Sequence, residues 1–404
     1  MKYHYGETIR EGREAANMTQ AQLAEKWPRT DGGTGVSVNY VSDIERGIKH
    51  ITDPQTLRHL CDILHLPYWK MGFSDYDPFN PSAFTVKGTF MYDETLNTAE
   101  SLIKRTWNLR RVMPFPYVEE AVNDLNRLFD YLKTNTPPPV RLDGRFQELY
   151  AQVLRLNGVI YVEKQQYEEA LSTFRRMHEI AKAIDHPATL AMSYLNIGTE
   201  LERMGKQEEA IESLELARDE SFRASKHIMI VTNAYLARAY ASAGQKVKFD
   251  RAIGVALRTA RSIETYGDGT DFVFHSLSGV LAEKSYGHLE IGEPEETLAM
   301  KEEIKSQIAL EANLWLDAWI PLDWARAYLM LDQFDKSVQA AQEFYRKAKL
   351  LKSNHAKSRA YRFLNTIEAA GYSDVQAVKD FRHMLDNEDR NGLKELDAHY
   401  LPYK

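Results

Sequence analysis

The sequence has little cysteine, proline or glycine: one cysteine, 14 prolines and 21 glycines in 404 residues. The lone Cys61 excludes an intramolecular disulfide and any site built from several cysteines, and it fits a reducing compartment. Low glycine and proline content disfavours collagen-like, disordered and turn-rich all-β proteins. No run approaches the roughly 18 apolar residues of a membrane span, and the polar start holds no secretion signal. We therefore expect a helix-rich cytoplasmic protein without a membrane segment.

The chain also lacks an excess of positive charge, since 51 Lys and Arg face 58 Asp and Glu, for a net charge of −7. Acidity of this kind argues at first against a nucleic-acid partner. However, residues 1–70 hold nine basic and nine acidic residues, so the acidic excess lies entirely in residues 71–404. The charge therefore leaves DNA binding open for the head of the chain and disfavours it for the tail.

Sequence patterns typical of enzymes are missing as well. There is no HExxH, GxxxxGK[ST], GxGxxG or GxSxG, and the twelve histidines are scattered. The GDGTD segment at 267–271 lacks the ligand spacing and final glutamate of a calcium loop, so we expect a turn between helices there. The sequence predicts no catalytic residue, no cofactor and no metal site.

The first seventy residues predict a series of short helices. Apolar spacing indicates a helix over 5–17, and Thr19 with Gln22 forms the sequence pattern of a capping box for a helix through about Trp27. Residues 28–34 are rich in glycine and predict a loop. Ser37 can cap a third helix, with Val38, Val41 and Ile44 expected inward and Gly47 ending it.

A fourth helix is predicted from Asp53-Pro54, which read as its N-cap and first-turn proline, to a point before Pro67. The segments TQAQLAEKW, GVSVNYVSDIERG and TLRHLCDILHL together resemble the Xre/Cro/cI-type helix-turn-helix family over about residues 5–67. One departure is the insertion at 28–34 in the turn before the recognition helix. We expect these residues to project into solvent or toward DNA.

The resemblance implies that the helix after Ser37 lies in the major groove of a DNA operator. Asn39 has an amide suited to bidentate contact with adenine, and Val38 can pack on a thymine methyl. It also implies a buried structural ion pair between Arg13 and Glu45. The expected DNA-binding residues are Gln20, Ser37, Val38, Asn39, Tyr40, Ser42, Asp43, Lys49 and His50.

Two other interpretations of the head stay open. A small four-helix domain with an amphipathic third helix can also dock on a protein, and Val38 and Tyr40 can be ordinary core residues. Cys61 lies on the apolar stripe of the fourth helix and is expected in the core. Because the head is electrically balanced, a single copy should hold DNA weakly, and a homodimer on two half-sites would compensate.

Residues 71–90 are expected to form an ordered connector, and residues 91–404 a helical domain. Helices are predicted over 92–112 and 117–133, with a break at TNTPPPV (134–140). An internal repeat follows, marked by a small residue at the start of each second helix. These markers are Ala170, Ala210, Ala252, Thr297, Ser337 and Ala377. Their spacings of 40, 42, 45, 40 and 40 residues indicate stacked helical hairpins.

The spacing from glycine to alanine to Phe174 or Leu214 resembles the tetratricopeptide repeat. The predicted fold is therefore all-α, a helix-turn-helix domain followed by a right-handed helical superhelix. Phe174 and Leu214 are expected to fill the gap to the next hairpin, and we expect the concave groove to bind an extended peptide. The expected peptide-binding residues are Gln152, Arg155, Asn157, Asn196, Thr199, Arg203, Asn233 and Arg238.

Each of the three groove asparagines can equally be a structural hydrogen-bonding residue. The tryptophan-rich segment LWLDAWIPLDW (314–324) can line a pocket, although its spacing favours repeat core. The whole arrangement resembles the RRNPP family of peptide-responsive quorum-sensing regulators. That implies a homodimer whose tail binds a short signalling peptide and modulates DNA binding. The alternative is a helix-turn-helix regulator whose tail is a protein-interaction scaffold without a peptide ligand.

Overall fold

A computed structural model describes residues 5–29, 33–73, 86–263, 272–273 and 276–386. By internal contacts the chain divides into two compact units. The first unit comprises Met1–Glu100 with Leu128–Leu149, and the second comprises Ser101–Arg127 with Tyr150–Lys404. The predicted domain boundaries at residues 70 and 90 stay predictions, and residues 74–85 of the predicted connector lie outside the described residues.

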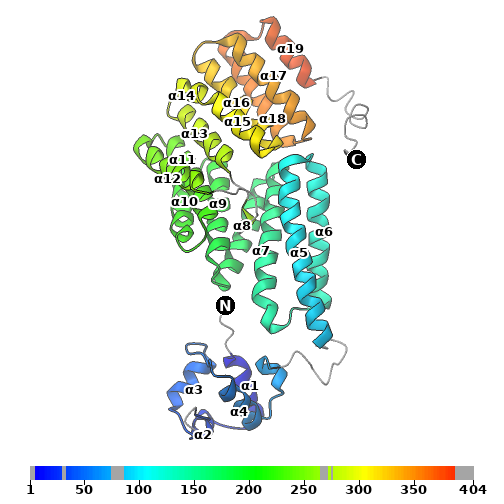
Figure 1. Ribbon diagram of the computed structural model, residues 1–404, viewed down its shortest axis with the longest axis vertical. Coiled ribbons are helices and arrows are strands. Elements are labelled where there is room, and N and C mark those ends of the chain that lie inside the picture. Colours follow the sequence, from blue (N-terminus) through cyan, green and yellow to red (C-terminus); the bar gives the residue numbers. More distant parts are fainter. Residues whose placement is uncertain (1–4, 30–32, 74–85, 264–271, 274–275, 387–404) are drawn as a thin grey trace. The chain divides into compact units, whose positions relative to one another are not determined.

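The first unit begins with short helices, coloured blue in Figure 1. They are α1 (Gly6–Ala15), α2 (Gln20–Lys26), α3 (Val38–Glu45), α4 (Pro54–Leu64) and the 3-10 helix η1 (Tyr68–Met71). Their side chains form one core, in which Ile9, Leu23, Trp27 and Leu60 are among the fully buried members. Cys61 lies in this core, and burial raises the pKa of its thiol to about 11.

The ends of these helices follow the predicted local chemistry. Thr19 and Gln22 form a reciprocal capping box on α2, and the Ser37 hydroxyl accepts from the Tyr40 N–H on α3. Asp53 caps α4 by accepting hydrogen bonds from two backbone N–H groups. Gly47 adopts a φ of 72° just after α3, the left-handed conformation that glycine tolerates best.

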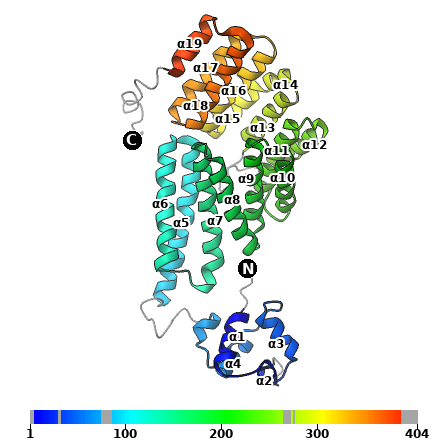
Figure 2. The ribbon, with the colours of Figure 1, turned by 180° about the vertical axis from the view of Figure 1, so that it is seen from behind.

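Three long helices follow: α5 (Val86–Val112), α6 (Phe115–Asn135) and α7 (Val140–Glu163). They run side by side in both views (Figures 1 and 2). In the first unit the rings of Phe129 and Phe146 pack 5.4 Å apart, and in the second the side chains of Asn126 and Asn157 exchange hydrogen bonds of 2.7 and 2.8 Å. The predicted break at 134–140 is confirmed by the gap between α6 and α7.

The rest of the second unit consists of successive antiparallel helix pairs (Figures 1 and 2). Those after α7 are α8 (Tyr167–Ala183), α9 (Pro187–Arg203), α10 (Gln207–Ser221), α11 (Lys226–Ser242), α12 (Lys246–Arg261), α13 (Leu277–Glu290), α14 (Pro294–Ala299), α15 (Lys301–Glu311), α16 (Leu314–Met330), α17 (Phe334–Leu350), α18 (Asn354–Ile367) and α19 (Gln376–Asp386). A π-helical turn, Glu368–Tyr372, follows α18. The segment GDGTD at 267–271 lies outside the described residues.

The small marker residues lie at the helix crossings. Ala170 and Ala210 are completely buried. At two other marker positions the residue carries a hydroxyl, and that hydroxyl donates a hydrogen bond. Thr297 donates to the carbonyl of Ser285 at 2.9 Å, and Ser337 donates to that of Ala325 at 2.8 Å. Each bond ties the second helix of a pair to the first, so a polar residue is tolerated without leaving a buried group unsatisfied.

Large residues pack on glycines within the same hairpin. The ring of Phe174 on α8 lies over Gly158 of α7, and Leu214 on α10 lies over Gly198 of α9. The sequence predicted that Phe174 and Leu214 fill the gap to the next hairpin. The structure shows this contact for Phe174, whose cluster includes Ile197 of the next hairpin, and it adds the packing of both side chains against their own hairpin.

The two ends of this repeat array meet within the second unit. The Phe115 N–H donates to the carbonyl of Leu351 at 2.8 Å, and the Ser353 hydroxyl donates to the buried Glu163 at 2.7 Å. The N-terminus of α6 and the C-terminus of α7 are thereby joined to the turn between α17 and α18 (Figures 1 and 2).

Substitution of Gly158 by alanine should destabilise the second unit by about 2 kcal/mol, because overpacking in a dense core is costly. An added Cβ would meet the Phe174 ring at 2.1 Å. Gly144→Ala is the matched control, since Gly144 lies on the same helix with nothing within 4 Å of an added Cβ. Alanine there should stabilise the helix by about 0.5–1 kcal/mol. Urea unfolding followed by circular dichroism measures both, and equal midpoints would contradict the packing argument.

Candidate functional site

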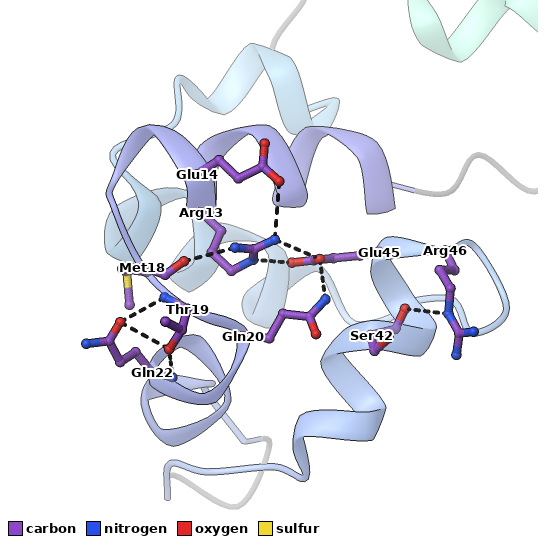
Figure 3. A network of polar contacts seen from close by, with 9 residues as sticks. All are labelled: Arg13, Glu14, Met18, Thr19, Gln20, Gln22, Ser42, Glu45 and Arg46. Carbon is purple, nitrogen blue, oxygen red and sulfur yellow. Dashed lines mark hydrogen bonds and ion pairs between the residues drawn. The ribbon is translucent and has the colours of Figure 1, made fainter.

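The recognition helix is fixed by a buried polar network at the start of the chain (Figure 3). Arg13 on α1 donates to both carboxylate oxygens of Glu45 on α3, from Nε at 2.6 Å and from a terminal nitrogen at 3.0 Å. It also donates to the carbonyl of Met18 at 2.9 Å. The hydrogen bond to Glu45 raises the pKa of Arg13. This is the structural ion pair that the resemblance implied, and it joins the first and third helices.

Gln20 belongs to the same network (Figure 3). Its side-chain amide donates to Glu45 at 2.7 Å, and the residue is half-buried at the start of α2. The sequence predicted Gln20 as a DNA-binding residue. The structure engages its NH₂ group with Glu45, so its immediate role is to hold the start of α2 against the end of α3.

The first turn of α3 presents its side chains to solvent. Ser37, Val38 and Asn39 are all exposed, and Val38 keeps 44% of its surface accessible. The prediction that Val38 faces inward is therefore wrong, whereas Val41 and Ile44 are buried as predicted. Exposure of an apolar side chain beside a free amide fits a surface that reads base edges.

Tyr40 and Asp43 are more constrained. Tyr40 is half-buried, with its ring edge-on to Trp27 at a centroid distance of 5.7 Å. Asp43 accepts from Arg46 at 2.9 Å and pairs with Lys49 at 3.0 Å, and these contacts, with Lys49 the stronger, lower the pKa of its carboxyl. Tyr40 thus contributes to the core, and the charge of Asp43 is balanced before any DNA contact.

The remaining predicted DNA contacts lie around the end of α3 and the following loop. Ser42 is half-buried, and its backbone carbonyl accepts from Arg46 (Figure 3). Lys49 and His50 are exposed in the loop before α4. The inserted loop closes into a small hairpin at its base, where Arg29 donates to the carbonyl of Gly33 at 2.9 Å. Residues 30–32 at its tip lie outside the described residues.

Replacing Glu45 with glutamine should destabilise the packing of α1 on α3 by about 2 kcal/mol, because the half-buried Arg13 loses its main counter-charge and two charge-assisted hydrogen bonds. Glu14→Gln is the control, since Glu14 is exposed and lies 3.5 Å from the same guanidinium. Hydrogen exchange of the α1 and α3 amides measures the local opening free energy. Equal protection in the two variants would contradict a structural role for the pair.

A cavity that is partly open to solvent lies within the second unit, and its empty volume, counted together with the solvent-filled space at its open side, is about 1200 Å³. Its walls come from α5, α7, α9, α11, α13 and the start of α16, together with the described residues Phe272 and Val273. The residues of the predicted groove that line it are Arg155, Asn196, Thr199 and Arg203. Half of the predicted peptide-binding set therefore converges on one hollow.

The other four residues predicted for the groove lie outside this lining. Gln152 is buried and donates to the Thr189 hydroxyl at 3.2 Å. Asn157 pairs with Asn126 between α6 and α7, and Asn233 donates to the carbonyl of Met229, one turn back on its own helix. These three side chains have structural partners.

Arg238 lies at the edge of the cavity without lining it. It donates to Glu202 at 3.3 Å and lies 3.7 Å from Glu283, a cavity residue, while its guanidinium stacks on Tyr286. Its contribution to the site is therefore to balance the charges of Glu202 and Glu283 at the edge of the cavity.

Sequence reasoning missed most of the polar and aromatic residues that line the cavity. Among the missed members are Trp107, Arg110, Arg111, Glu163, Glu200, Tyr235, Glu283 and Asn313. The sequence WNLRR at 107–111 could have indicated the earliest of them, because it places a tryptophan and two arginines close together on a helix otherwise marked by apolar spacing.

Arg155 shows how uneven the charge in the cavity is. Only 8% of this residue is exposed, and its guanidinium lies 4.2 Å from the Trp107 ring while one terminal nitrogen donates to the carbonyl of Phe272. Burial, with the neighbouring charge of Arg110, lowers the pKa of Arg155 to about 9. Arginine still carries its charge at neutral pH. The charged guanidinium of Arg155 is therefore buried in the cavity although its removal from water is unfavourable.

In the tryptophan-rich segment at 314–324, one tryptophan lines the cavity and the others belong to the repeat core. Trp315 lines the cavity, with Arg110 over its ring at 4.8 Å, whereas Trp324 is 2% exposed in the repeat core. Trp319 packs between Phe344 and His355, and burial lowers the pKa of His355 to about 3. His355 is thus a neutral core residue at physiological pH.

Glu283 gives the cavity a pH-dependent contribution to stability. Burial outweighs the attraction of Arg238 and raises the pKa of Glu283 to about 7, from the ordinary 4.5. The folded protein therefore binds a proton more readily than the unfolded chain, and the resulting stability is lost as the pH rises through 7.

The titration of Glu283 should make the free energy of unfolding of the parent protein about 2 kcal/mol larger at pH 5 than at pH 8. Glu283→Gln, which cannot titrate, should lose this part of the pH dependence. Urea midpoints of the variant and the parent protein at both pH values measure this difference. Glu295→Gln, at an exposed position on α14, is the control and should leave the pH dependence unchanged. A Glu283→Gln profile that parallels the parent profile would contradict the proposed titration.

Comparisons with known proteins agree with the two-part organisation. A helix-turn-helix domain profile matches residues 4–67, and a tetratricopeptide repeat profile matches residues 149–219. The chain thus carries an N-terminal helix-turn-helix domain followed by tetratricopeptide-type repeats, and the predicted all-α fold is confirmed. A comparison with curated proteins gave no match.

Among solved structures, the chain is similar to PlcR of Bacillus thuringiensis, crystallised in complex with the peptide PapR7 and DNA. The alignment covers 95% of this chain and 99% of PlcR, at 12% identity and a TM-score of 0.39.

None of the helices in the described ranges is long and apolar enough to cross a membrane. Within the same ranges, no group of three or more histidine, cysteine, aspartate or glutamate residues is placed to hold a metal ion.

Proposed function

We propose that this protein is a transcriptional regulator that binds a DNA operator through α3 and a short signalling peptide through the cavity of its repeats. The observation that carries the proposal is the cavity, whose polar lining includes buried groups without hydrogen-bond partners among the described residues. These atoms are Nε of Arg111, Arg155 and Arg203, Nε1 of Trp107 and one oxygen of Glu200. Such groups are costly to bury and gain partners when a ligand binds.

A peptide suits this cavity better than a small apolar molecule does. A peptide backbone offers a donor and an acceptor at each residue. The Asn196 amide donates once to the carbonyl of Met192, which leaves its oxygen and its second N–H for a ligand, and the Thr199 hydroxyl, which donates to the carbonyl of Asn196, can still accept. These groups lie beside apolar Val231 and Leu195. The concave shape also supports this function over the alternative of a protein-interaction scaffold, because ligand sites are clefts or cavities that surround most of the ligand.

DNA binding is supported by the exposed first turn of α3. Ser37 and Asn39 present polar atoms, Val38 presents an apolar surface, and the Arg13–Glu45 pair fixes the helix that carries them. Direct reading of bases requires side chains of this kind held on a rigid element. The head is electrically balanced, so we propose that the regulator acts as a homodimer on two half-sites in the cytoplasm.

Asn39→Ala should weaken binding to the operator by about 2 kcal/mol, roughly 30-fold, because one bidentate base contact is lost. The operator is first obtained by selection from random-sequence duplexes, and affinity is then measured by gel shift. Gln55→Ala, at an exposed position at the start of α4, is the control and should leave affinity unchanged. Hydrogen exchange of α3 should be equal in both. Unaltered operator affinity in Asn39→Ala would contradict the assignment of the recognition helix.

The coupling of peptide to DNA is tested with synthetic peptides derived from short reading frames beside the gene. A peptide that binds should change operator affinity by about fivefold or more, in either direction, since coupling between sites is typically 1–3 kcal/mol. Light scattering measures whether the protein is a dimer with and without peptide. A peptide that binds the cavity and leaves operator affinity unchanged would contradict the regulatory function.

A further inference from the structure

Three arginines line the cavity without forming an ion pair with any described residue, and two of them, Arg110 and Arg155, are close enough for the charge of one to act on the other. They are Arg110 and Arg111 from α5 and Arg155 from α7. The carboxylates that line the same cavity are engaged: Glu200 pairs with Arg203, Glu163 accepts from Ser353, and Glu283 faces Arg238. The charge imbalance therefore belongs to the arginines.

The hydrogen bonds of these arginines also leave donors unused. Arg155 donates from one terminal nitrogen to the carbonyl of Phe272 at 3.0 Å, and Arg111 donates to that of Glu311 at 3.3 Å. The Nε–H groups of both are buried without a partner. A guanidinium presents five donors in a planar fork, so each can bind a further acceptor without breaking the bond that it has.

Two tryptophans hold the arginines in place. Arg155 stacks on Trp107 at 4.2 Å, and Arg110 stacks on Trp315 at 4.8 Å. Trp107 is 6% exposed, and its indole N–H is a further buried donor without a partner. The rings fix the planes of the guanidinium groups, which lowers the entropy lost when an anion binds.

We propose that Arg110, Arg111 and Arg155, with the indole N–H of Trp107, bind a carboxylate of the peptide ligand. This inference rests on the proposed function and adds the chemistry of the ligand. The carboxylate is either the C-terminus of the peptide or an aspartate or glutamate side chain, because both present the same planar pair of oxygens. Charge-assisted bidentate bonds from arginine are the strongest and most geometrically selective way to recognise that group.

The test uses the full chain and three synthetic sets of N-acetylated heptapeptides built from uncharged residues. The first set ends in a free carboxylate, the second in a carboxamide, and the third in a carboxamide with one glutamate at a varied position. Each set is incubated with the protein, and retained peptides are quantified by mass spectrometry after gel filtration. Retention of the first or third set at least about tenfold above the second is expected, and the set retained identifies the source of the carboxylate.

Variants assign the effect to these residues. Arg155→Gln and Arg110→Gln should each reduce the excess retention to less than about threefold, since a charged partner of the carboxylate is lost. Arg251→Gln, at an exposed position on α12, should keep it. Arg155→Gln should unfold at a temperature no lower than the parent protein, because it removes a buried charge that has no ion-pair partner among the described residues.

The outcomes separate the two proposals. Equal retention of all three sets, or preference for the neutral set, would overturn the carboxylate site while leaving peptide binding in place. No retention of any set would overturn both. Excess retention that survives in Arg155→Gln and Arg110→Gln would also overturn this site, because the carboxylate would then bind elsewhere.

Discussion

The close approach of paired helices, permitted by a small residue at each crossing, is the constraint on which the repeat unit depends. Gly158 under Phe174 and Gly198 under Leu214 leave no room for a methyl group. Because protein interiors are packed as densely as organic crystals, this spacing sets the position of each hairpin relative to its partner helix. Residues on α7, α9 and α11 then reach a common cavity without any of them being adjacent in sequence.

Local chemistry made the head of the chain predictable. Thr19, Ser37 and Asp53 are caps whose preference depends on the few residues beside them, and the structure uses all three. Val38 was misassigned because helical periodicity alone does not distinguish the first turn of a helix from its interior. The hydrogen bond from Gln20 to Glu45 was not predictable from a local pattern, since Glu45 is distant in sequence and belongs to another helix.

The cavity was only partly predictable from the repeat pattern. Arg155 and Gln152 are one helical turn apart on α7, yet the first lines the cavity and the second bonds to Thr189 behind it. Periodicity gives the face of a helix and not the depth of a residue within the packed layers. Trp107 and Arg110 precede the recognisable repeats, so their position depends on how the array bends back on itself, which no local pattern encodes.

The contacts of α6 and α7 with the turn between α17 and α18 affect how the second unit folds. Repeat proteins are ordinarily one-dimensional, with each hairpin contacting only its neighbours, so that terminal repeats open independently. Here the Phe115–Leu351 and Glu163–Ser353 hydrogen bonds connect residues about two hundred positions apart. Contacts of such high sequence separation form late and raise the contact order. The closed array therefore gains cooperativity in unfolding at the cost of a slower final step in folding.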